Sequence, residues 1–363
     1  MDRSIARIGV ALGVLILNAA TASAAVSFNF TNGGTATAQM MAGAAQAGAL
    51  WSAQFHDPIT INITINAASY AGGIVAHTDT YYDPYAYTDV RNALLADRLS
   101  ADDLSSSSAL QSGSAFSMLI NRTRNNPAGV VSTTPYFDTG LGGPGQAGAE
   151  NNSTVRIPSA NAKALGLYPG NGAGTDGILT FSTNVSFDYD RSNGINASQA
   201  DFVGVAAHEI GHMLGFVSGV DVLAGNAAAP GLYDNQLKFV TPLDLYRFSS
   251  RSIGTGGGIG VNDWTADSAV KYFSVDGGSA FVAEFSTGAT YEESHWKNNI
   301  GLGLMDPTVA AGELLTISSN DLRAFDVIGY NLSVPEPASA TLVLALGVIM
   351  LTGRRQRRSA SAV

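Results

Sequence analysis

The segment VAAHEIGHMLGF, residues 205–216, constrains the fold more than any other part of this sequence. His208 and His212 are four residues apart, so in an α-helix they lie one turn apart on the same face. Two imidazoles at that spacing can bind one zinc ion. Glu209 lies about 100° further round the helix, where it can contact a water at the metal but cannot easily share the metal with both histidines. The segment therefore predicts a helix that carries part of a zinc site.

The HExxH pattern rarely arises by chance in a chain of this composition. With five histidines and seven glutamates in 363 residues, such a match is expected about once in a thousand chains. The alternative, in which these histidines only pack or form hydrogen bonds, therefore carries little weight. His56 and His77 have no such spacing, and we interpret each as a structural or surface residue.

The third protein ligand is missing from the position where it is first expected. In the pattern HExxHxxGxxH, a histidine follows the glycine by three residues. Gly215 is in place, but Ser218 stands where that histidine would be. No glutamate occurs between Glu209 and residue 284. The sequence leaves two substitutes, Asp221 and the distant His295, which is the only histidine after His212.

Local patterns predict the elements around the zinc helix. Isoleucines at 59, 61, 63 and 65 alternate with polar residues, which is typical of a strand with one face in the core. Gly215 is expected to end the zinc helix and reverse the chain. Helices are expected at 35–53, 88–103 with Thr88 as cap, 199–214 with Ser198 as cap, and 320–331 with Asn320 as cap; a strand is expected at 176–190 and a hairpin at 271–285.

The surroundings of His295, in SHWKNNIGLGLMDP, resemble those of the leishmanolysin branch of the metzincin zinc proteases. That branch has HExxHxxGF, a long insertion, a third histidine in an SHW context, a Met-turn and a closing helix. Met305 occupies the Met-turn position, and the likeness is good over 176–331 and loose over 50–175. TPLDLYRFS (241–249) and YFSVDGG (272–278) further resemble exported bacterial members of the branch.

The resemblance implies an α+β fold for residues 25–334. An N-terminal lobe to about residue 215 would hold a twisted mixed sheet and the zinc helix. A C-terminal lobe, 216–334, would bring His295 as the third zinc ligand and Met305 as the floor of the site. The segment 178–188, which precedes the zinc helix, is the expected edge strand for an extended substrate.

The implied activity is that of a zinc-dependent endopeptidase with one catalytic Zn²⁺. Glu209 would act as general base and then general acid while the metal activates a water and polarises the peptide carbonyl. Two alternatives remain: a non-catalytic exported surface or matrix protein that keeps the zinc-stabilised fold, and a zinc hydrolase acting on non-peptide amide bonds. Ca²⁺ is conceivable, but no loop has a recognisable calcium pattern.

Both ends of the chain indicate export across the cytoplasmic membrane. Residues 1–24 combine two arginines, a short apolar run and a small-residue cleavage site, as in a signal peptide for signal peptidase. Residues 335–363 contain Pro-Glu-Pro, an apolar segment and an arginine cluster, and resemble the PEP-CTERM sorting signal. That resemblance implies an exosortase-type partner and a protein at the cell surface, in the extracellular matrix or secreted. A plain transmembrane anchor at the C-terminus is the alternative.

Charge and cysteine content restrict the kinds of site and of binding partner that this chain can have. The chain has no cysteine, which excludes disulfides, thiolate ligands and cysteine-based latency. Its formal net charge is −10. Residues 25–337 alone would carry −15, because six arginines and Asp2 lie outside this range. Such a surface disfavours nucleic acids and anionic membranes as partners. The resemblance to zinc proteases implies protein or peptide substrates.

Overall fold

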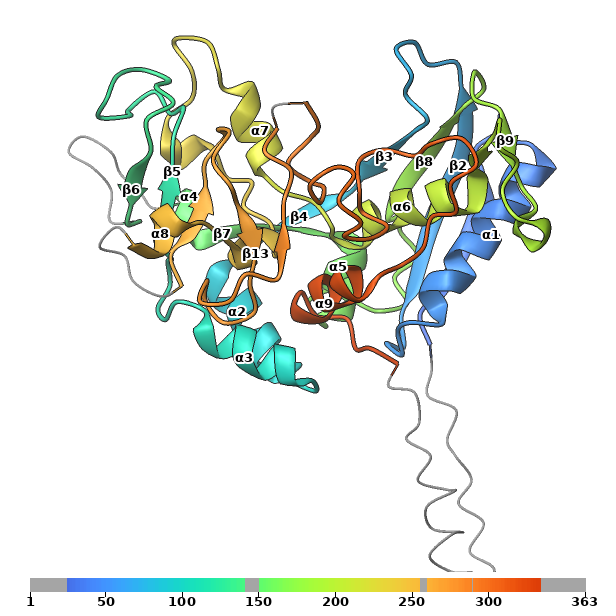
Figure 1. Ribbon diagram of the computed structural model, residues 1–363. Helices are drawn as coiled ribbons and strands as arrows, with labels where there is room; N and C mark the ends of the chain where they lie inside the picture. The colour runs from blue at the N-terminus through green and yellow to red at the C-terminus, as the bar shows by residue number, and fades with distance from the viewer. Residues whose placement is uncertain (1–24, 141–149, 255–259, 289, 334–363) are drawn as a thin grey trace, which may run out of the picture.

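The computed structural model describes residues 25–140, 150–254, 260–288 and 290–333 (Figure 1). The expected signal peptide at 1–24 and sorting signal at 335–363 lie outside the described residues. The described chain is a mixed α+β structure, as expected, and forms two parts that lie side by side (Figure 1).

A four-stranded sheet forms the base of the first part, in the order β1-β2-β8-β3. Its strands are β1 (Ser27–Asn32), β2 (Thr60–Ala68), β8 (Gly177–Ser182) and β3 (Ala76–Thr80). The first three are parallel, and β3 is antiparallel at one edge. The isoleucine alternation places Ile61, Ile63 and Ile65 in the core while the residues between them are half-buried. The predicted strand is therefore confirmed.

Two helices cover the buried face of this sheet. Helix α1 (Ala38–Ser52) is capped by Thr37, and helix α6 (Phe202–Leu214) carries the HExxH motif. The indole Nε1 of Trp51 in α1 donates to the carbonyl of Ala207 in α6 at 2.9 Å. This contact fixes the zinc-motif helix against α1 and the sheet. The helix expected at 35–53 is thus confirmed.

The second part contains several small sheets and short helices. One sheet contains β12 (Asn262–Trp264), β5 (Met118–Ile120) and β6 (Tyr136–Asp138), in that order. A second contains β11 (Arg247–Phe248), β13 (Tyr272–Phe273) and β14 (Ala283–Glu284). Strand β4 (Tyr82–Ala86) pairs with β7 (Thr154–Pro158). The helices are α2 (Tyr87–Ala96), α3 (Ala101–Ala109), α4 (Glu150–Ser153), α7 (Val220–Gly225) and α8 (Ser250–Gly254). Residues on both sides of the expected lobe boundary at 215 thus share one sheet, β12-β5-β6. The antiparallel pair β13-β14 lies where the hairpin was expected.

The remaining short elements are distributed over the two parts. They are α5 (Ser159–Ala164), the pair β9 (Phe187–Asp188) and β10 (Ala200–Asp201), the 3₁₀ turns Arg191–Asn193, Asp234–Gln236 and Leu243–Tyr246, and the closing helix α9 (Ser319–Val327). In Figure 1 the segment that follows residue 290 returns across the middle of the molecule toward α6. That return brings residues 291–295 and 306–309 to the zinc-motif helix.

The single helix expected at 88–103 is wrong, because the chain forms two helices there. Helix α2 begins at Tyr87, and no side chain caps it, so the expected cap role of Thr88 is also wrong. Ser100 starts α3 instead, where its hydroxyl accepts from Asp103 N and the Asp103 carboxylate accepts from Ser100 N. This reciprocal capping stabilises a new helix start and interrupts the expected one.

Two other helix starts differ from the prediction by a few residues. Asp201, not Ser198, caps α6: its carboxylate accepts from Gly204 N at 3.0 Å and is fully buried beside Arg191. Ser318, not Asn320, caps α9. In both cases the observed cap also forms a hydrogen bond or ion pair with a residue outside its own helix. Local sequence does not reveal these additional contacts.

The strand expected at 176–190 is also only partly right. A turn after Ser182 divides it into β8 and the short β9. Strand β8 pairs with β2 on one side and with β3 on the other, so its expected role as an exposed edge is wrong. Strand β3 is the edge of the sheet on that side.

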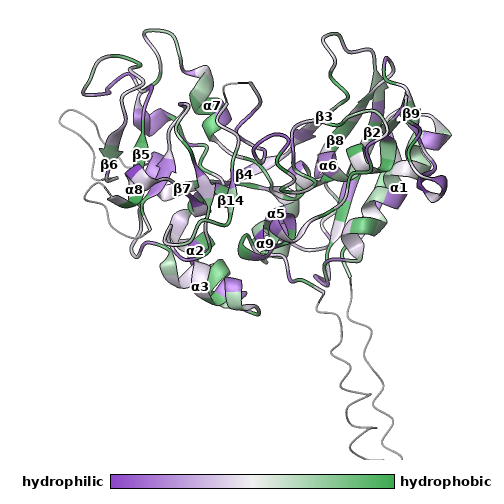
Figure 2. Ribbon diagram, in the orientation of Figure 1, coloured by the Kyte–Doolittle hydropathy of each residue, from purple (hydrophilic) through white to green (hydrophobic). Residues whose placement is uncertain are grey.

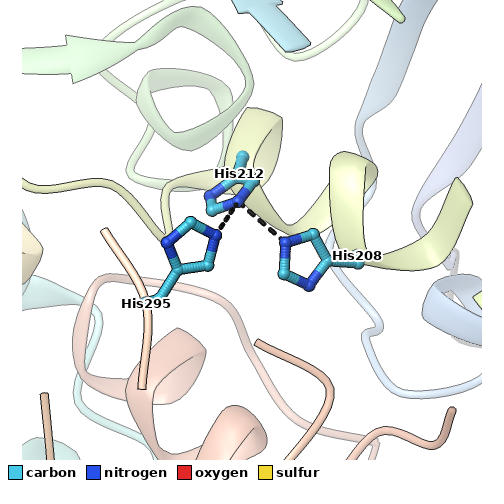
Figure 3. Close-up of side chains that lie close together, drawn as sticks. All are labelled: His208, His212 and His295. Carbon is cyan, nitrogen blue, oxygen red and sulfur yellow. Dashed lines mark hydrogen bonds between the residues drawn. The ribbon is translucent and has the colours of Figure 1, made fainter. Parts of the chain in front are cut away.

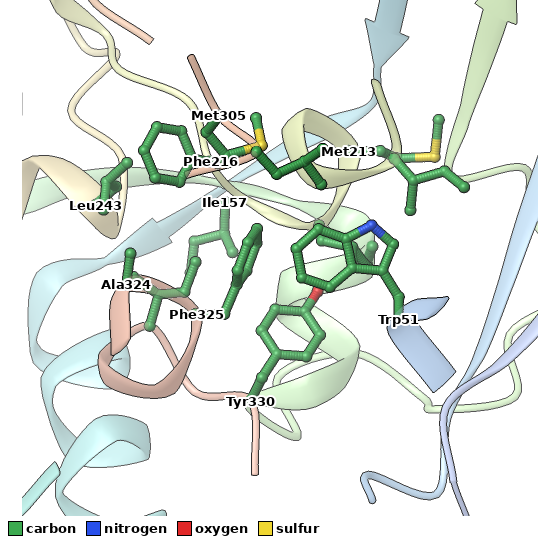
Figure 4. Close-up of a cluster of buried hydrophobic side chains, with 14 of the residues drawn as sticks. Trp51, Ile157, Met213, Phe216, Leu243, Met305, Ala324, Phe325 and Tyr330 are labelled. Atoms are coloured by element: carbon green, nitrogen blue, oxygen red, sulfur yellow. The ribbon is translucent and has the colours of Figure 1, made fainter. Parts of the chain in front are cut away.

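A hydrophobic core lies beneath α6 and connects it to α9 (Figure 4). The labelled side chains include Trp51, Met213, Phe216, Met305 and Phe325, all fully buried.

Hydrophobic and hydrophilic residues are interleaved along the helices (Figure 2). Among the helices that the structure describes, none has the length and apolar character needed to cross a membrane.

Candidate metal centre

A cleft of about 580 Å³ runs between strand β3 and the segments at 291–295 and 306–309. His208, Glu209, His212 and His295 all line it. The structure therefore brings the distant His295 to the two helical histidines, and all four side chains face one space. No sequence spacing encodes this approach, because the chain between His212 and His295 passes through the second part of the molecule.

The helix end at Gly215 sets the orientation of the His212 ring. Gly215 has φ of +128°, and its N–H donates to the carbonyl of His212 while Phe216 N donates to that of Gly211. These bonds end the helix in a turn that reverses the chain. The turn places the Phe216 carbonyl 2.7 Å from His212 Nδ1. The predicted role of Gly215 as the helix-ending turn is confirmed.

The three imidazoles converge through their Nε2 atoms (Figure 3). His212 Nε2 lies 3.0 Å from His208 Nε2 and 3.2 Å from His295 Nε2. Their ligand atoms all lie within 4.8 Å of one another, so the three side chains could hold one metal ion. Among the described residues, no cysteine or carboxylate joins this group.

The hydrogen bonds of the three Nδ1 atoms indicate whether a cation fits between the Nε2 atoms. Each Nδ1 faces a backbone carbonyl: Leu304 O at 2.8 Å for His208, Phe216 O at 2.7 Å for His212, and Glu292 O at 3.2 Å for His295. A carbonyl only accepts, so each Nδ1 carries the proton and each Nε2 presents a lone pair. The lone pair of His212 lies about 3 Å from each of the other two Nε2 atoms, so the lone pairs repel one another unless a cation lies between them. The donor set therefore fits a metal ion.

Burial keeps two of these rings neutral. It lowers the pKa of His212 well below its usual value, and the neighbouring His208 and His295 lower it further. Burial, with a smaller effect of His208, lowers the pKa of His295 to about 3. Neutral imidazoles are the form that binds metals, so the site does not have to lose protons near neutral pH.

Glu209 lies beside the histidines but outside their ligand group. Its side chain is 8% exposed and lines the cleft. The hydroxyl of Thr78, on the edge strand β3, donates to Glu209 Oε2 and contacts the Glu209 carbonyl as well. Thr78 thus holds the carboxylate in place, a contact that the sequence did not suggest.

Asp221, the alternative third ligand, has a different place in the structure. Its carboxylate is turned toward the chain just before His295, where Oδ1 accepts from Glu293 N at 2.6 Å and Oδ2 from Ser294 N at 3.2 Å and from the Ser294 hydroxyl. Asp221 does not belong to the group of possible ligands. It holds the segment that carries His295.

A buried ion pair supports the same segment from below. Arg247 and Glu293 form a salt bridge in which both side chains are 1% exposed. The guanidinium carbon of Arg247 also lies 4.8 Å from the centre of the Phe285 ring. The backbone of Phe285 forms an antiparallel β-bridge with that of Trp296. The residues on both sides of His295 are therefore anchored to the second part of the molecule.

Met305 packs against the site helix α6. It is fully buried, and a side-chain carbon placed on Gly211 of α6 would lie 2.5 Å from its sulfur. The carbonyl of Met305 accepts from Trp296 N at 2.9 Å. Asp321 of α9 accepts from Leu304 N at 2.7 Å and from the Trp296 indole at 2.8 Å. Asp321, which sequence reasoning missed, thus joins the closing helix to the turn that carries Met305.

The remaining two histidines lie outside the ligand group. His77 is on β3 and lines the cleft, but its ring is 57% exposed and faces Asp79 at 3.3 Å. His56 follows α1, and its backbone N–H donates to Asn331. Neither histidine contributes to the convergence of Nε2 atoms.

The comparisons with known proteins leave the site as the main source of information on function. The chain matches no family model, no curated protein and no solved structure. The positions of the three histidines, of Glu209 and of the residues that hold them therefore indicate what the protein does.

Replacing Gly215 by alanine is expected to destabilise the protein by about 1–3 kcal/mol, because an alanine is strained at a φ of +128°. Its added carbon would also lie 2.8 Å from a methyl of Ile328. Urea unfolding measures the change. Gly225→Ala is the control, since nothing lies within 4 Å of its added carbon and its φ is not positive. Equal stability of the Gly215→Ala variant and the parent would contradict this account of the turn.

Proposed function

We propose that this protein is a zinc-dependent endopeptidase. The observation that carries the proposal is the convergence of three imidazole Nε2 atoms in an open cleft, with Glu209 beside them on the same helix. Three neutral nitrogen ligands with an open position are typical of catalytic zinc sites. The proposed ligands are His208, His212 and His295.

The metal and the Glu209 carboxylate would have separate roles in the reaction. When bound, zinc supplies a Lewis acid that polarises a carbonyl oxygen and lowers the pKa of water at its open position. Glu209 takes the proton from the attacking water and returns it to the leaving amine. The Thr78 hydroxyl orients one oxygen of Glu209, which leaves the other free to exchange the proton.

The edge strand β3 is the proposed site for the substrate backbone. Its residues 76–78 and Thr80 line the cleft, and its free side has no partner strand in the described sheet. An extended peptide can add to such an edge through main-chain hydrogen bonds. The peptide would then cross the cleft in front of the three histidines.

Other features support a leishmanolysin-like, metzincin-type arrangement as part of the proposal. Met305 lies under the site helix, and α9 closes the core behind it. We further propose that the protein is exported, with residues 1–24 as the signal peptide and 335–363 as a sorting signal processed by an exosortase-type enzyme.

One experiment separates this function from its alternatives. The purified protein should contain about one zinc per chain and digest an unfolded protein such as casein. A chelator should abolish digestion, and added zinc should restore it. Zinc without any digestion would instead favour a non-catalytic surface or matrix protein. Cleavage of small acylated amines but of no peptide would favour a hydrolase of non-peptide amides, and absence of a metal would refute the proposal.

A further inference from the structure

A group of carboxylates lies where the closing helix α9 meets the segment that joins α2 to α3, residues 97–103 (Figure 1). Asp97 directly follows α2, Asp102 and Asp103 lie in the first turn of α3, and Asp326 lies in α9. Asp103 and Asp326 are buried, and none of the four lines the cleft. Helices α2 and α3 belong to the second part of the molecule, so this group, the α9 junction, connects that part to the closing helix.

Hydrogen bonds across the α9 junction use these carboxylates as acceptors. The Ser100 hydroxyl donates to Asp326 Oδ2 at 2.5 Å. Asn331, which follows α9, donates through Nδ2 to Asp97 Oδ1 at 3.2 Å and to Asp57 Oδ1 at 2.9 Å. Among the described residues, no donor reaches the buried Oδ1 of Asn331. The junction is therefore short of donors, and a proton on a carboxyl group would supply one.

The arginines near the junction do not pair with Asp97 or Asp326. Arg323 of α9 pairs with Asp102 at 2.5 Å, and Arg98 Nε donates to a serine hydroxyl of α3 at 2.8 Å. Within the described part of the chain, neither Asp97 nor Asp326 forms an ion pair of its own. The titratable groups that face these two carboxylates are Asp57 with its neighbour His56, Asp102, Asp103, Arg323 and the fully buried Tyr246.

Asp97 binds its proton tightly in this setting. Burial is the largest cause that raises the pKa of Asp97, to about 7, and the charges of Asp103, Asp57 and Asp326 raise it further. The hydrogen bond from Asn331 acts in the opposite direction. The folded protein therefore holds a proton on Asp97 under mildly acidic conditions, whereas an ordinary aspartate has lost it.

The same causes act on Asp326. Burial raises its pKa to about 7, Asp103 and Asp102 raise it further, and Arg323 and the Ser100 hydroxyl act in the opposite direction. A metal ion does not take the place of the protons, because these carboxylates form no group of possible metal ligands among the residues that the structure describes.

The direction of the pH dependence follows from these raised pKa values. An unfolded aspartate loses its proton at about pH 4. Between about pH 4 and pH 7 the folded protein keeps protons on Asp97 and Asp326 that the unfolded chain has released, so the free energy of unfolding falls as the pH rises. Above about pH 7 both carboxylates are charged in the folded protein, and the loss of stability is complete.

We propose that Asp97 and Asp326 form a proton-dependent latch that holds α9 against the α2–α3 segment under mildly acidic conditions and loosens it at neutral and alkaline pH. Loosening reaches the metal centre through Asp321, on the same helix, which accepts from Leu304 N at 2.7 Å next to Met305. The latch depends on packing and charge alone, so it stands or falls independently of the endopeptidase activity.

Melting temperatures of the full chain with zinc, compared at pH 5 and pH 8, test the latch. The variants are Asp97→Asn and Asp326→Asn, which keep an acceptor oxygen but carry no charge. The melting temperature of each variant relative to the parent should be about 3 °C higher at pH 8 than at pH 5. Each comparison is made at one pH, so effects of pH on the zinc site cancel.

The double variant tests whether the two carboxylates act together. Removing one charge lowers the pKa of the other, because Asp326 is one of the charges that raise the pKa of Asp97. The pH-dependent gain of the double variant should therefore be smaller than the sum of the two single gains. A sum that is fully additive would contradict a shared latch.

The matched control is Asp89→Asn, an exposed carboxylate in the first turn of α2. Its effect on the melting temperature should be the same at pH 5 and pH 8. Hydrogen exchange at pH 8, followed by mass spectrometry, locates the change: both latch variants should slow exchange in α9 and in residues 97–103 relative to the parent, and leave β2 unchanged. Latch variants whose advantage does not grow with pH, or that gain stability without slower exchange in α9, would overturn the inference.

Discussion

Replacing Glu209 by glutamine is expected to lower peptide hydrolysis by about 10³-fold while the protein keeps its metal. Glutamine has nearly the same shape and still accepts from the Thr78 hydroxyl, but it cannot take a proton from water. Glu209 lies outside the ligand group, so the three histidines remain intact. Initial rates on a quenched peptide and the zinc content of the same sample measure the two effects.

The matched control for this variant is Glu150→Gln. Glu150 lies in α4, pairs with Lys238 and has a side chain that is 55% exposed, away from the cleft. Its replacement should leave both rate and metal content unchanged. A Glu209→Gln variant that hydrolyses peptide at the parent rate would exclude Glu209 as the general base. Loss of the metal together with activity would mean that Glu209 helps to hold the ion.

The elements with strong local periodicity were predictable from sequence. The HExxH spacing predicted a helix with two histidines on one face, and both side chains do converge. The isoleucine alternation predicted β2, because residues two apart in a strand point to the same face, and burying that face buries all the isoleucines. His295 was expected at the site because its SHW context resembles that of a known family. Physical reasoning alone could not rank His295 above Asp221 as the third ligand.

Several of the errors share one physical cause, which is competition from contacts with residues outside the local segment. Asp201 caps α6 in place of Ser198 because its carboxylate also pairs with Arg191, ten residues earlier. Strand β8 looked like an edge because residue order along the chain does not give strand order in a sheet, and β3 pairs on its outer side. The hydrogen bond from Thr78 to Glu209 spans 131 residues, and no local signal could have suggested it.

Asp221 shows most clearly what sequence reasoning lacked. A carboxylate nine residues after His212 could chemically be a ligand, and only the fold determines that it faces residues 293 and 294 instead. Asp221 is a positioning residue in this arrangement. It fixes the backbone on the N-terminal side of His295, and the third imidazole depends on that backbone for its approach to the other two.

Replacing Asp221 by asparagine is therefore expected to weaken zinc binding by about 10- to 100-fold. The new amide would present a donor to Ser294, whose N–H and hydroxyl both donate to the present carboxylate. The segment before His295 would then shift, and the ion would lose part of its third ligand. Competition with a chelator of known affinity measures the change. Cobalt substitution gives a second readout, because the visible spectrum of the bound ion reports a change in its ligands.

Melting temperatures with and without zinc separate positioning of the ligand from a general loss of stability. A ligand that binds only the folded protein raises its stability in proportion to the logarithm of its affinity, so a 10- to 100-fold loss removes about 1.4–2.8 kcal/mol of that gain. Asp57→Asn is the control, since Asp57 is buried, accepts from Asn331 N and Nδ2, and lies outside the cleft. It should lower both melting temperatures equally. If Asp221→Asn behaves in the same way, with an unchanged increase on adding zinc, then Asp221 stabilises the fold but does not position His295.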